Sequence, residues 1–134
     1  MERIRPLIAV LDDEPQVGKS LARLLKAHGF DVVTFTHGAE FLAATQSWLP
    51  NCLLLDLNMP GLDGFEVLER ISTRHVPVIV ITGRDQPGNV QRVRALGALN
   101  YFLKPVNEHE LMDAIREAVQ RPTGIEPDNT SRPR

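Results

Sequence analysis

The segment LLLDLNMPGLDGFEVL, which begins at Leu53, constrains the fold more than any other part of the sequence. Its first residues form an apolar run that is typical of a buried strand, and the run stops at Asp56. A loop with Pro60, Gly61 and Gly64 follows, and a helical spacing of apolar residues begins after it. Open α/β sheets bind their ligands at the carboxyl ends of parallel strands. The segment therefore predicts an α/β fold with its chemistry at Asp56.

Five short apolar runs alternate with five helical patterns along the chain. Several of the runs are continuously apolar, as expected for parallel strands that helices cover on both faces. The predicted strands are Leu7–Leu11, Val32–Phe35, Cys52–Leu55, Val78–Ile81 and Tyr101–Leu103. We expect the second helix to end before Pro50, and Asn107 to cap the fifth helix with Glu110 three residues on. Strands that alternate with single helices predict right-handed crossovers and a doubly wound parallel sheet.

Composition limits the class of protein. The 134 residues suffice for one domain with a hydrophobic core, and 43% hydrophobic with 24% charged residues is ordinary for a globular protein. The net charge of −2 predicts no strong attraction to nucleic acid or to an acidic membrane. Cys52 is the single cysteine, so an internal disulfide is excluded. The amino terminus does not resemble a secretion signal, and no apolar run approaches the ~20 residues that span a bilayer. These features predict a cytoplasmic protein.

The helical pattern stops at Gln120. The following segment, RPTGIEPDNTSRPR, has three prolines, one glycine and a single large apolar residue, Ile125. Such a segment buries too little apolar surface to order itself. We therefore predict a domain over residues 1–121 and a flexible tail or linker over residues 122–134.

Two more carboxylates, Asp12 and Asp13, directly follow the first predicted strand. In a doubly wound sheet the first strand lies next to the third, which brings these carboxylates close to Asp56. Two carboxylates about 4 Å apart repel each other by roughly 4 kcal/mol at an effective dielectric constant near 20. A magnesium ion, which prefers oxygen ligands, would relieve that repulsion. Paired acids after a strand can alternatively cap the next helix, and the nearby Asp56 and Lys104 favour the metal site.

Two further strands end in groups that suit a phosphoryl site. Lys104 follows the fifth strand, where its ammonium could contact a phosphoryl oxygen, although a strand-end lysine is commonly a solvated surface charge. Thr82 ends VIVIT, where its hydroxyl could donate to the same group or could merely cap a turn. Each residue alone is unspecific, whereas their joint placement at successive strand ends indicates one site.

Four motifs, in this order and at this spacing, resemble the receiver domain of two-component response regulators. They are LDDE at Leu11–Glu14, LLLDLNMPGLDG around Asp56, VIVITG ending at Gly83, and YFLKP at Tyr101–Pro105. The resemblance covers about residues 5–120. It implies a flavodoxin-like (βα)5 fold with strand order 2-1-3-4-5. It also implies a phospho-accepting signalling switch that catalyses only its own phosphorylation and dephosphorylation.

The resemblance implies a role for each residue of the acidic site. Asp56 would accept a phosphoryl group from a phosphohistidine. Asp13, Asp56 and the main-chain carbonyl of Asn58 would bind Mg²⁺, and Asp12 would bind it through water. Lys104 would contact the phosphoryl group.

The same resemblance implies a conformational switch. Thr82 would move toward the phosphoryl oxygen, and Tyr101 would fill the space that it leaves. Asn58 and Arg84 occupy the positions that tune hydrolysis of the acyl phosphate in the family. Val106 stands where phenylalanine is frequent in the family and Gly83 where alanine is common, so the loops around the switch depart from the commonest family pattern, whereas the groups needed for phosphorylation are all present.

Two other classes of function compete with a signalling switch. A phosphatase or phosphotransferase with an aspartate nucleophile would carry a second aspartate two residues later, where this chain has Asn58. A purely structural interaction module would have no need of the intact set Asp13, Asp56, Thr82 and Lys104.

The implied partners are a sensor histidine kinase or a histidine phosphotransfer protein, and a downstream protein target or output domain. A phosphorylation-dependent homodimer is a further expectation, whereas direct nucleic-acid binding by this chain and a membrane partner are not expected. We expect a stand-alone or phosphorelay receiver. The alternative is the amino-terminal receiver of a DNA-binding transcriptional regulator.

Overall fold

Five parallel strands form the central sheet, in the order β2-β1-β3-β4-β5. The computed structural model describes residues 5–59, 61 and 63–120. The strands are β1 (Leu7–Leu11), β2 (Asp31–Phe35), β3 (Cys52–Leu55), β4 (Val78–Thr82) and β5 (Asn100–Leu103). The predicted five-stranded, doubly wound sheet and its strand order are confirmed.

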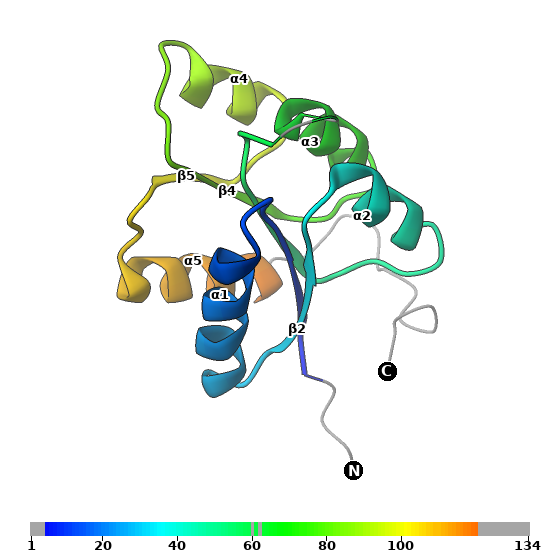
Figure 1. The fold of residues 1–134 in the computed structure, drawn as a ribbon, viewed down its shortest axis with the longest axis vertical. Coiled ribbons are helices and arrows are strands. Elements are labelled where there is room, and N and C mark those ends of the chain that lie inside the picture. The colour runs from blue at the N-terminus through cyan, green and yellow to red at the C-terminus, as the bar shows by residue number, and fades with distance from the viewer. Residues whose placement is uncertain (1–4, 60, 62, 121–134) are drawn as a thin grey trace.

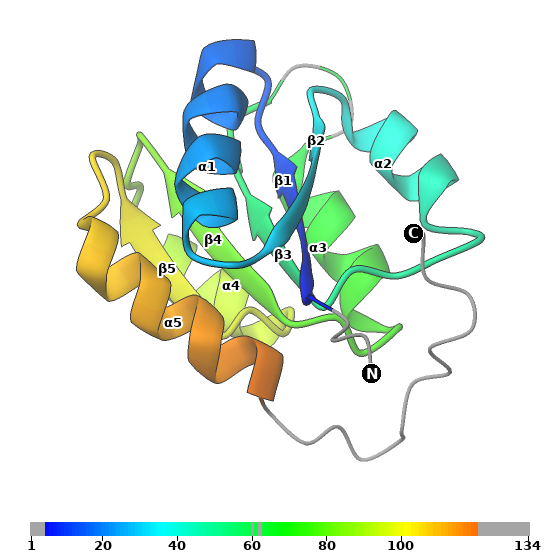
Figure 2. The same cartoon turned by 90° about the horizontal axis from the view of Figure 1, so that it is seen from below.

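One helix follows each strand. The helices are α1 (Pro15–Ala27), α2 (Gly38–Ala44), α3 (Gly64–Ser72), α4 (Asn89–Ala95) and α5 (Glu108–Gln120). Helices α1 and α5 cover one face of the sheet, and α2, α3 and α4 cover the other (Figures 1 and 2). The four crossovers that join the parallel strands all start from the same edge of the sheet, so every strand ends on the side where the loops to the helices lie.

Both faces of the sheet are apolar, which explains the continuously apolar runs. Ala9 and Leu11 of β1 pack against the side of α2, α3 and α4, whereas Ile8 and Val10 pack against the side of α1 and α5. Cys52 belongs to the second cluster, where burial raises the pKa of its thiol to about 12. The thiol therefore packs as a small apolar group.

Helix α2 is shorter than predicted. It ends at Ala44 rather than just before Pro50, so this prediction is wrong. The Thr45 hydroxyl donates to the carbonyl of Phe41 at 3.0 Å, and the Arg74 guanidinium donates to the carbonyl of Thr45. The Arg74 guanidinium thus supplies a partner for a carbonyl just past the end of the helix, where the helical ladder no longer supplies one.

The predicted cap of α5 is confirmed, since the side chain of Asn107 accepts the backbone N–H of Glu110 at 2.9 Å. The predicted tail, residues 122–134, lies outside the described residues, so the domain boundary near residue 121 stays a prediction. No helix within the described residues has both the length and the apolar character that crossing a bilayer requires.

Candidate functional site

Three carboxylates meet at the carboxyl ends of β1 and β3. Oxygen atoms of Asp12, Asp13 and Asp56 all lie within 4.8 Å of one another. Asp12 and Asp56 are only 4% and 5% exposed, and Asp13 is half-buried. The backbone N–H of Asp56 donates to the carbonyl of Leu11 at 3.0 Å, which fixes the two strand ends side by side. The structure therefore brings together the three aspartates that the sequence predicts to be close.

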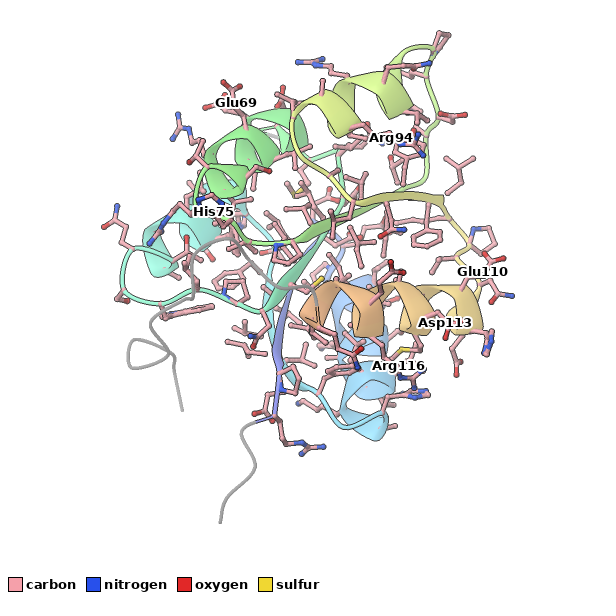
Figure 3. The ribbon with its side chains drawn as sticks, turned by 180° about the vertical axis from the view of Figure 1, so that it is seen from behind. Glu69, His75, Arg94, Glu110, Asp113 and Arg116 are labelled. Atoms are coloured by element: carbon pink, nitrogen blue, oxygen red, sulfur yellow. The ribbon has the colours of Figure 1, made fainter. Side chains whose placement is uncertain are left out.

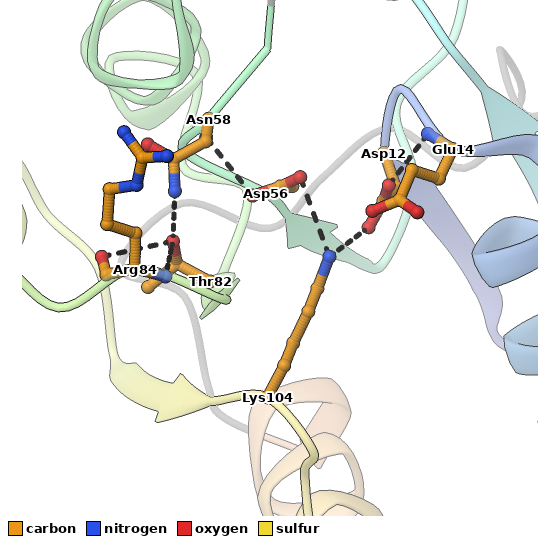
Figure 4. Close-up of polar contacts among 7 residues, drawn as sticks. All are labelled: Asp12, Glu14, Asp56, Asn58, Thr82, Arg84 and Lys104. Atoms are coloured by element: carbon orange, nitrogen blue, oxygen red, sulfur yellow. Dashed lines mark hydrogen bonds and ion pairs between the residues drawn. The ribbon is translucent and has the colours of Figure 1, made fainter.

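Lys104 reaches this cluster from the end of β5 (Figure 4). Its Nζ lies 2.9 Å from Asp12 Oδ2 and 3.6 Å from Asp56 Oδ2. Its backbone N–H donates to the carbonyl of Thr82 at 2.9 Å, so the bond to β4 fixes the backbone from which the lysine side chain extends. The ammonium thus points inward, rather than into solvent as a surface lysine would.

The ionisation of Asp56 and Lys104 reflects this crowding. Burial is the largest influence on Asp56 and raises its carboxyl pKa, with the charges of Asp12 and Asp13 acting in the same direction. The N–H of Asn58 and the ammonium of Lys104 oppose that rise without cancelling it. Burial acts to lower the pKa of Lys104, but the hydrogen bond to Asp12 and the neighbouring carboxylates outweigh it and raise that pKa.

The donor set fits a divalent metal ion that prefers oxygen. Within the part of the chain that the structure describes, these three carboxylates meet one ammonium, that of Lys104, which leaves an excess of two negative charges when all four groups are ionised. Mg²⁺ typically takes one or two protein carboxylates and retains waters or phosphate oxygens as its other ligands. The cluster of Asp12, Asp13 and Asp56 supplies enough carboxylates for that kind of site.

The hydroxyl of Thr82 lies beside the cluster but is bonded elsewhere. Thr82 is fully buried, and the side-chain amide of Asn58 donates to its Oγ1 at 2.7 Å. The backbone N–H of Arg84 lies 3.3 Å from the same oxygen, and the hydroxyl faces the carbonyl of Arg84 at 3.4 Å. In Figure 4 the dashed lines from Thr82 lead to Asn58 and Arg84 and none leads to Asp56.

Tyr101 on β5 is partly exposed, and its hydroxyl is bonded to the loop that precedes α4 and to the first residue of α4. Its hydroxyl donates to Asp85 Oδ1 at 2.9 Å and accepts from Asn89 Nδ2 at 3.4 Å. Burial is the largest influence that raises the pKa of the phenol, so the hydroxyl is protonated and able to donate. The predicted switch residues Thr82 and Tyr101 therefore lie on adjacent strands, each with its hydroxyl held by other groups.

A glycine at the start of α3, Gly64, packs closely against the backbone of the loop that follows Asp56. A Cβ on Gly64 would lie 2.5 Å from the Cα of Leu57, closer than real Cβ contacts allow. The N–H of Gly64 donates to the carbonyl of Leu57 at 3.3 Å, and Asp63 caps α3 by accepting from the N–H of Glu66 at 2.9 Å. Helix α3 thus begins directly against the backbone that follows the carboxylate.

Several contacts of the site were not predicted from the sequence. The bond from Asn58 to Thr82 and the bonds of Tyr101 to Asp85 and Asn89 join residues far apart in the chain or on different elements. The polar residue types were visible, but their side-chain orientations depend on how the strands pack. The close approach at Gly64 had a visible signal, namely a glycine directly after an aspartate that can cap a helix.

Comparison with known proteins identifies the family to which a chain with this site belongs. The family model described as the response regulator receiver domain matches residues 8–116. The chain belongs to the response regulator receiver family. The resemblance seen in the motifs is thereby confirmed, and receiver domains are signalling switches rather than enzymes that act on small substrates.

Individual relatives of this receiver domain differ in length. It is 35% identical over 120 residues to the phosphate regulon transcriptional regulatory protein PhoB of Rhizobium meliloti, covering 87% of this chain and 53% of that protein. It therefore spans about half the length of that regulator. It is 32% identical over 112 residues to protein PilH of Pseudomonas aeruginosa, covering 81% of this chain and 93% of PilH.

A solved structure gives the same fold. The CheY-like response regulator receiver domain protein from Methanospirillum hungatei superposes with a TM-score of 0.82 at 27% sequence identity, covering 87% of this receiver domain and 94% of that chain. The flavodoxin-like (βα)5 arrangement expected from the motifs is therefore confirmed.

Proposed function

We propose that this receiver domain accepts a phosphoryl group from a phosphohistidine onto Asp56 in a Mg²⁺-dependent reaction. The observation that carries the proposal is the meeting of Asp12, Asp13, Asp56 and Lys104 within one small cluster. Asp56 supplies a carboxylate oxygen as nucleophile, and Lys104 supplies a cation 3.6 Å from that carboxylate. The donor would be a sensor histidine kinase or a histidine phosphotransfer protein in the cytoplasm.

The reaction exchanges one bond to phosphorus for another. A carboxylate oxygen of Asp56 attacks phosphorus in line, and a new O–P bond forms. The P–N bond to the donor histidine breaks, and its electron pair returns to the imidazole nitrogen. Lys104 offsets the negative charge that gathers on the phosphoryl oxygens.

Asp13, Asp56 and the main-chain carbonyl of Asn58 would hold Mg²⁺, with Asp12 acting through water. When bound, the ion neutralises phosphoryl charge and aligns the phosphoryl group with the nucleophile. The excess of carboxylates over cations at the cluster supports this assignment.

Loss of the phosphoryl group requires a water to reach phosphorus. Asn58 and Arg84 are exposed residues that contact Thr82 beside the cluster (Figure 4). We propose that these two side chains modulate hydrolysis, with Arg84 changing the lifetime of the acyl phosphate by screening the site. Comparing the decay of phosphorylated wild type with that of Arg84→Ala tests this, and equal rates would contradict it.

Signalling would pass from Thr82 through Tyr101 to the face formed by α4, β5 and α5. In Figure 3, Arg94 projects from α4, and Glu110 and Asp113 project from α5, with β5 running between the two helices. Basic α4 and acidic α5 side chains on one face suit a protein partner, either a downstream target or a second copy of the chain after phosphorylation.

We propose that the domain acts as a stand-alone or phosphorelay receiver. The alternative is the receiver of a DNA-binding regulator. Neither form requires this domain to contact nucleic acid directly.

The deciding experiment uses a small-molecule donor. Incubation of the wild-type protein with acetyl phosphate and Mg²⁺ is expected to add the mass of one PO₃ group by intact mass spectrometry. Asp56→Asn is expected to abolish that gain, whereas Asp31→Asn, at an exposed strand end far from the cluster, is expected to retain it. No gain in wild type, or an equal gain in Asp56→Asn, would overturn the proposal.

A further inference from the structure

Asn58 contacts both the carboxylate and the threonine of the site. Its backbone N–H donates to Asp56 Oδ1 at 3.1 Å, and its side-chain amide donates to Thr82 Oγ1 at 2.7 Å. Asn58 therefore links the end of β3 to the end of β4 through two different groups. The backbone contact survives any substitution other than proline, whereas the contact to Thr82 depends on the asparagine side chain.

In this arrangement, both lone pairs and the proton of the Thr82 hydroxyl face a polar group. A threonine hydroxyl offers one proton and two lone pairs. The two N–H donors, from Asn58 at 2.7 Å and from the backbone of Arg84 at 3.3 Å, account for the lone pairs. The proton faces the carbonyl of Arg84 at 3.4 Å, which is long for a hydrogen bond.

The bond from Asn58 is the shortest of these contacts, and it joins the buried Thr82 to the side chain of an exposed residue. Thr82 has no exposed surface, so its hydroxyl depends on the protein groups around it for hydrogen-bond partners. Turning the hydroxyl toward a group on Asp56 breaks or stretches this bond, and a buried donor or acceptor without a partner is costly. The contact therefore favours the position that Thr82 has in this structure.

We propose that the side chain of Asn58 is a positioning residue that holds the Thr82 hydroxyl away from Asp56 until a phosphoryl group arrives. The inference rests on the proposed function, because it concerns the movement of Thr82 toward that group. It assigns to Asn58 an effect on the equilibrium of the switch, separate from any effect on the rate of hydrolysis.

Beryllium trifluoride with Mg²⁺ tests the proposal, because it mimics a phosphoryl group on a carboxylate and is not hydrolysed. Asn58→Ala keeps the main-chain groups of residue 58 and removes only the amide. A net hydrogen bond of typical strength corresponds to about a fivefold change in an equilibrium constant. We therefore expect Asn58→Ala to bind beryllium trifluoride about fivefold more tightly than wild type.

A double-mutant cycle separates positioning from other effects. In a Thr82→Ala background there is no hydroxyl to hold, so adding Asn58→Ala is expected to leave the affinity within about twofold. The methyl resonance of Thr82 in unliganded Asn58→Ala is expected to shift toward its position in the saturated complex. A purely structural role of Asn58 would lower the unfolding free energy without moving either readout.

The outcomes distinguish the two proposals. If wild type binds beryllium trifluoride but Asn58→Ala binds it equally or more weakly, the positioning role is wrong and the proposed function stands. A fivefold gain that persists in the Thr82→Ala background overturns the positioning role as well. If wild type does not bind beryllium trifluoride at all, the proposed function fails and this inference fails with it.

Discussion

At the scale of single residues, the site is governed by opposing influences on the pKa of one buried carboxyl, that of Asp56. Burial and the charges of two neighbouring carboxylates raise this pKa, whereas the backbone N–H of Asn58 and the ammonium of Lys104 lower it. The first group prevails, so ionisation of the Asp56 carboxyl is less favourable in the folded, metal-free protein than in the unfolded chain. The repulsion between clustered carboxylates lowers the stability of the metal-free fold, and the same negative charge favours the binding of a cation.

This balance predicts how Asp56→Asn changes stability with pH. Because the folded-state pKa lies above the ordinary value of 3.8, the folded protein binds the proton more tightly than the unfolded chain. The wild type therefore loses stability as the pH rises through the interval between those two pKa values. Asp56→Asn cannot ionise, so we expect the metal-free variant to be more stable than wild type at neutral pH.

The measurement is urea unfolding without metal at several pH values. The difference between variant and wild type should shrink as the pH falls below the ordinary carboxyl pKa, where both residues are neutral. The exposed Asp31→Asn should show no such trend. A variant that is less stable than wild type at neutral pH would show that the carboxylate stabilises the fold.

Lys104 is predicted to have the opposite effect on stability. Its raised pKa means that the folded protein favours the ammonium, so its contribution is present at neutral pH and is lost only as the pH rises through the alkaline range. Lys104→Met keeps much of the apolar stem and removes the charge, leaving Asp12 and Asp56 without their cation. We expect a loss of about 2 kcal/mol in unfolding free energy and slower phosphorylation by acetyl phosphate.

Lys19→Met on the exposed side of α1 is the matched control for removing one lysine charge. It should change the unfolding free energy by less than about 0.5 kcal/mol and leave phosphorylation unchanged. If Lys104→Met behaved like this control, the two ion pairs would have no energetic role.

At the scale of elements, local sequence predicts most of the architecture but not every boundary. The strands were predictable because their apolar runs record burial on both faces, as the alternation of Ile8 and Ala9 between the two clusters shows. The end of α2 was not predictable, and the partner of the carbonyl just past that end, Arg74, lies 29 residues later in the chain. A contact of that range has no local signal.

The start of α3 carries a prediction about packing. Alanine at Gly64 would place its Cβ 2.5 Å from the Cα of Leu57 and 2.8 Å from the carbonyl oxygen of Asp56, so backbone must move. We expect Gly64→Ala to lower the unfolding free energy by about 1–3 kcal/mol and to weaken Mg²⁺ binding, since the loop after Asp56 is displaced.

Gly18 in α1 provides the matched control. A Cβ there would meet Thr34 at 3.6 Å, which is ordinary contact. Because alanine favours a helix interior over glycine, Gly18→Ala should raise the unfolding free energy by about 0.5–1 kcal/mol. Urea titration of both variants checks the pair, and equal effects would mean that the approach at Gly64 is not tight.

At the scale of the whole molecule, the topology assembles the site. The order β2-β1-β3-β4-β5 places β1 between β2 and β3, so Asp12 and Asp56 become neighbours although 44 residues separate them. This much was predictable from strand ends and topology. The orientation of Thr82 toward Asn58 was not, because it depends on side-chain packing between strands rather than on strand order.

The assembled charge also predicts how metal binding couples to the stability of the whole domain. A ligand that binds only the folded state stabilises it by about 2.7 kcal/mol at a hundredfold excess over its dissociation constant. We therefore expect Mg²⁺ to raise the unfolding free energy of the wild type, with the increase growing with the Mg²⁺ concentration.

Asp13→Asn removes one of the three clustered carboxylates, so this variant should be more stable than wild type without metal and gain less stability from Mg²⁺. Thermal unfolding across a Mg²⁺ titration, with K⁺ matched for ionic strength, measures both effects. Without metal, a loss of stability in Asp13→Asn comparable to a core substitution would show that Asp13 is a structural residue, and an equal response of both proteins to Mg²⁺ would remove it from the metal site.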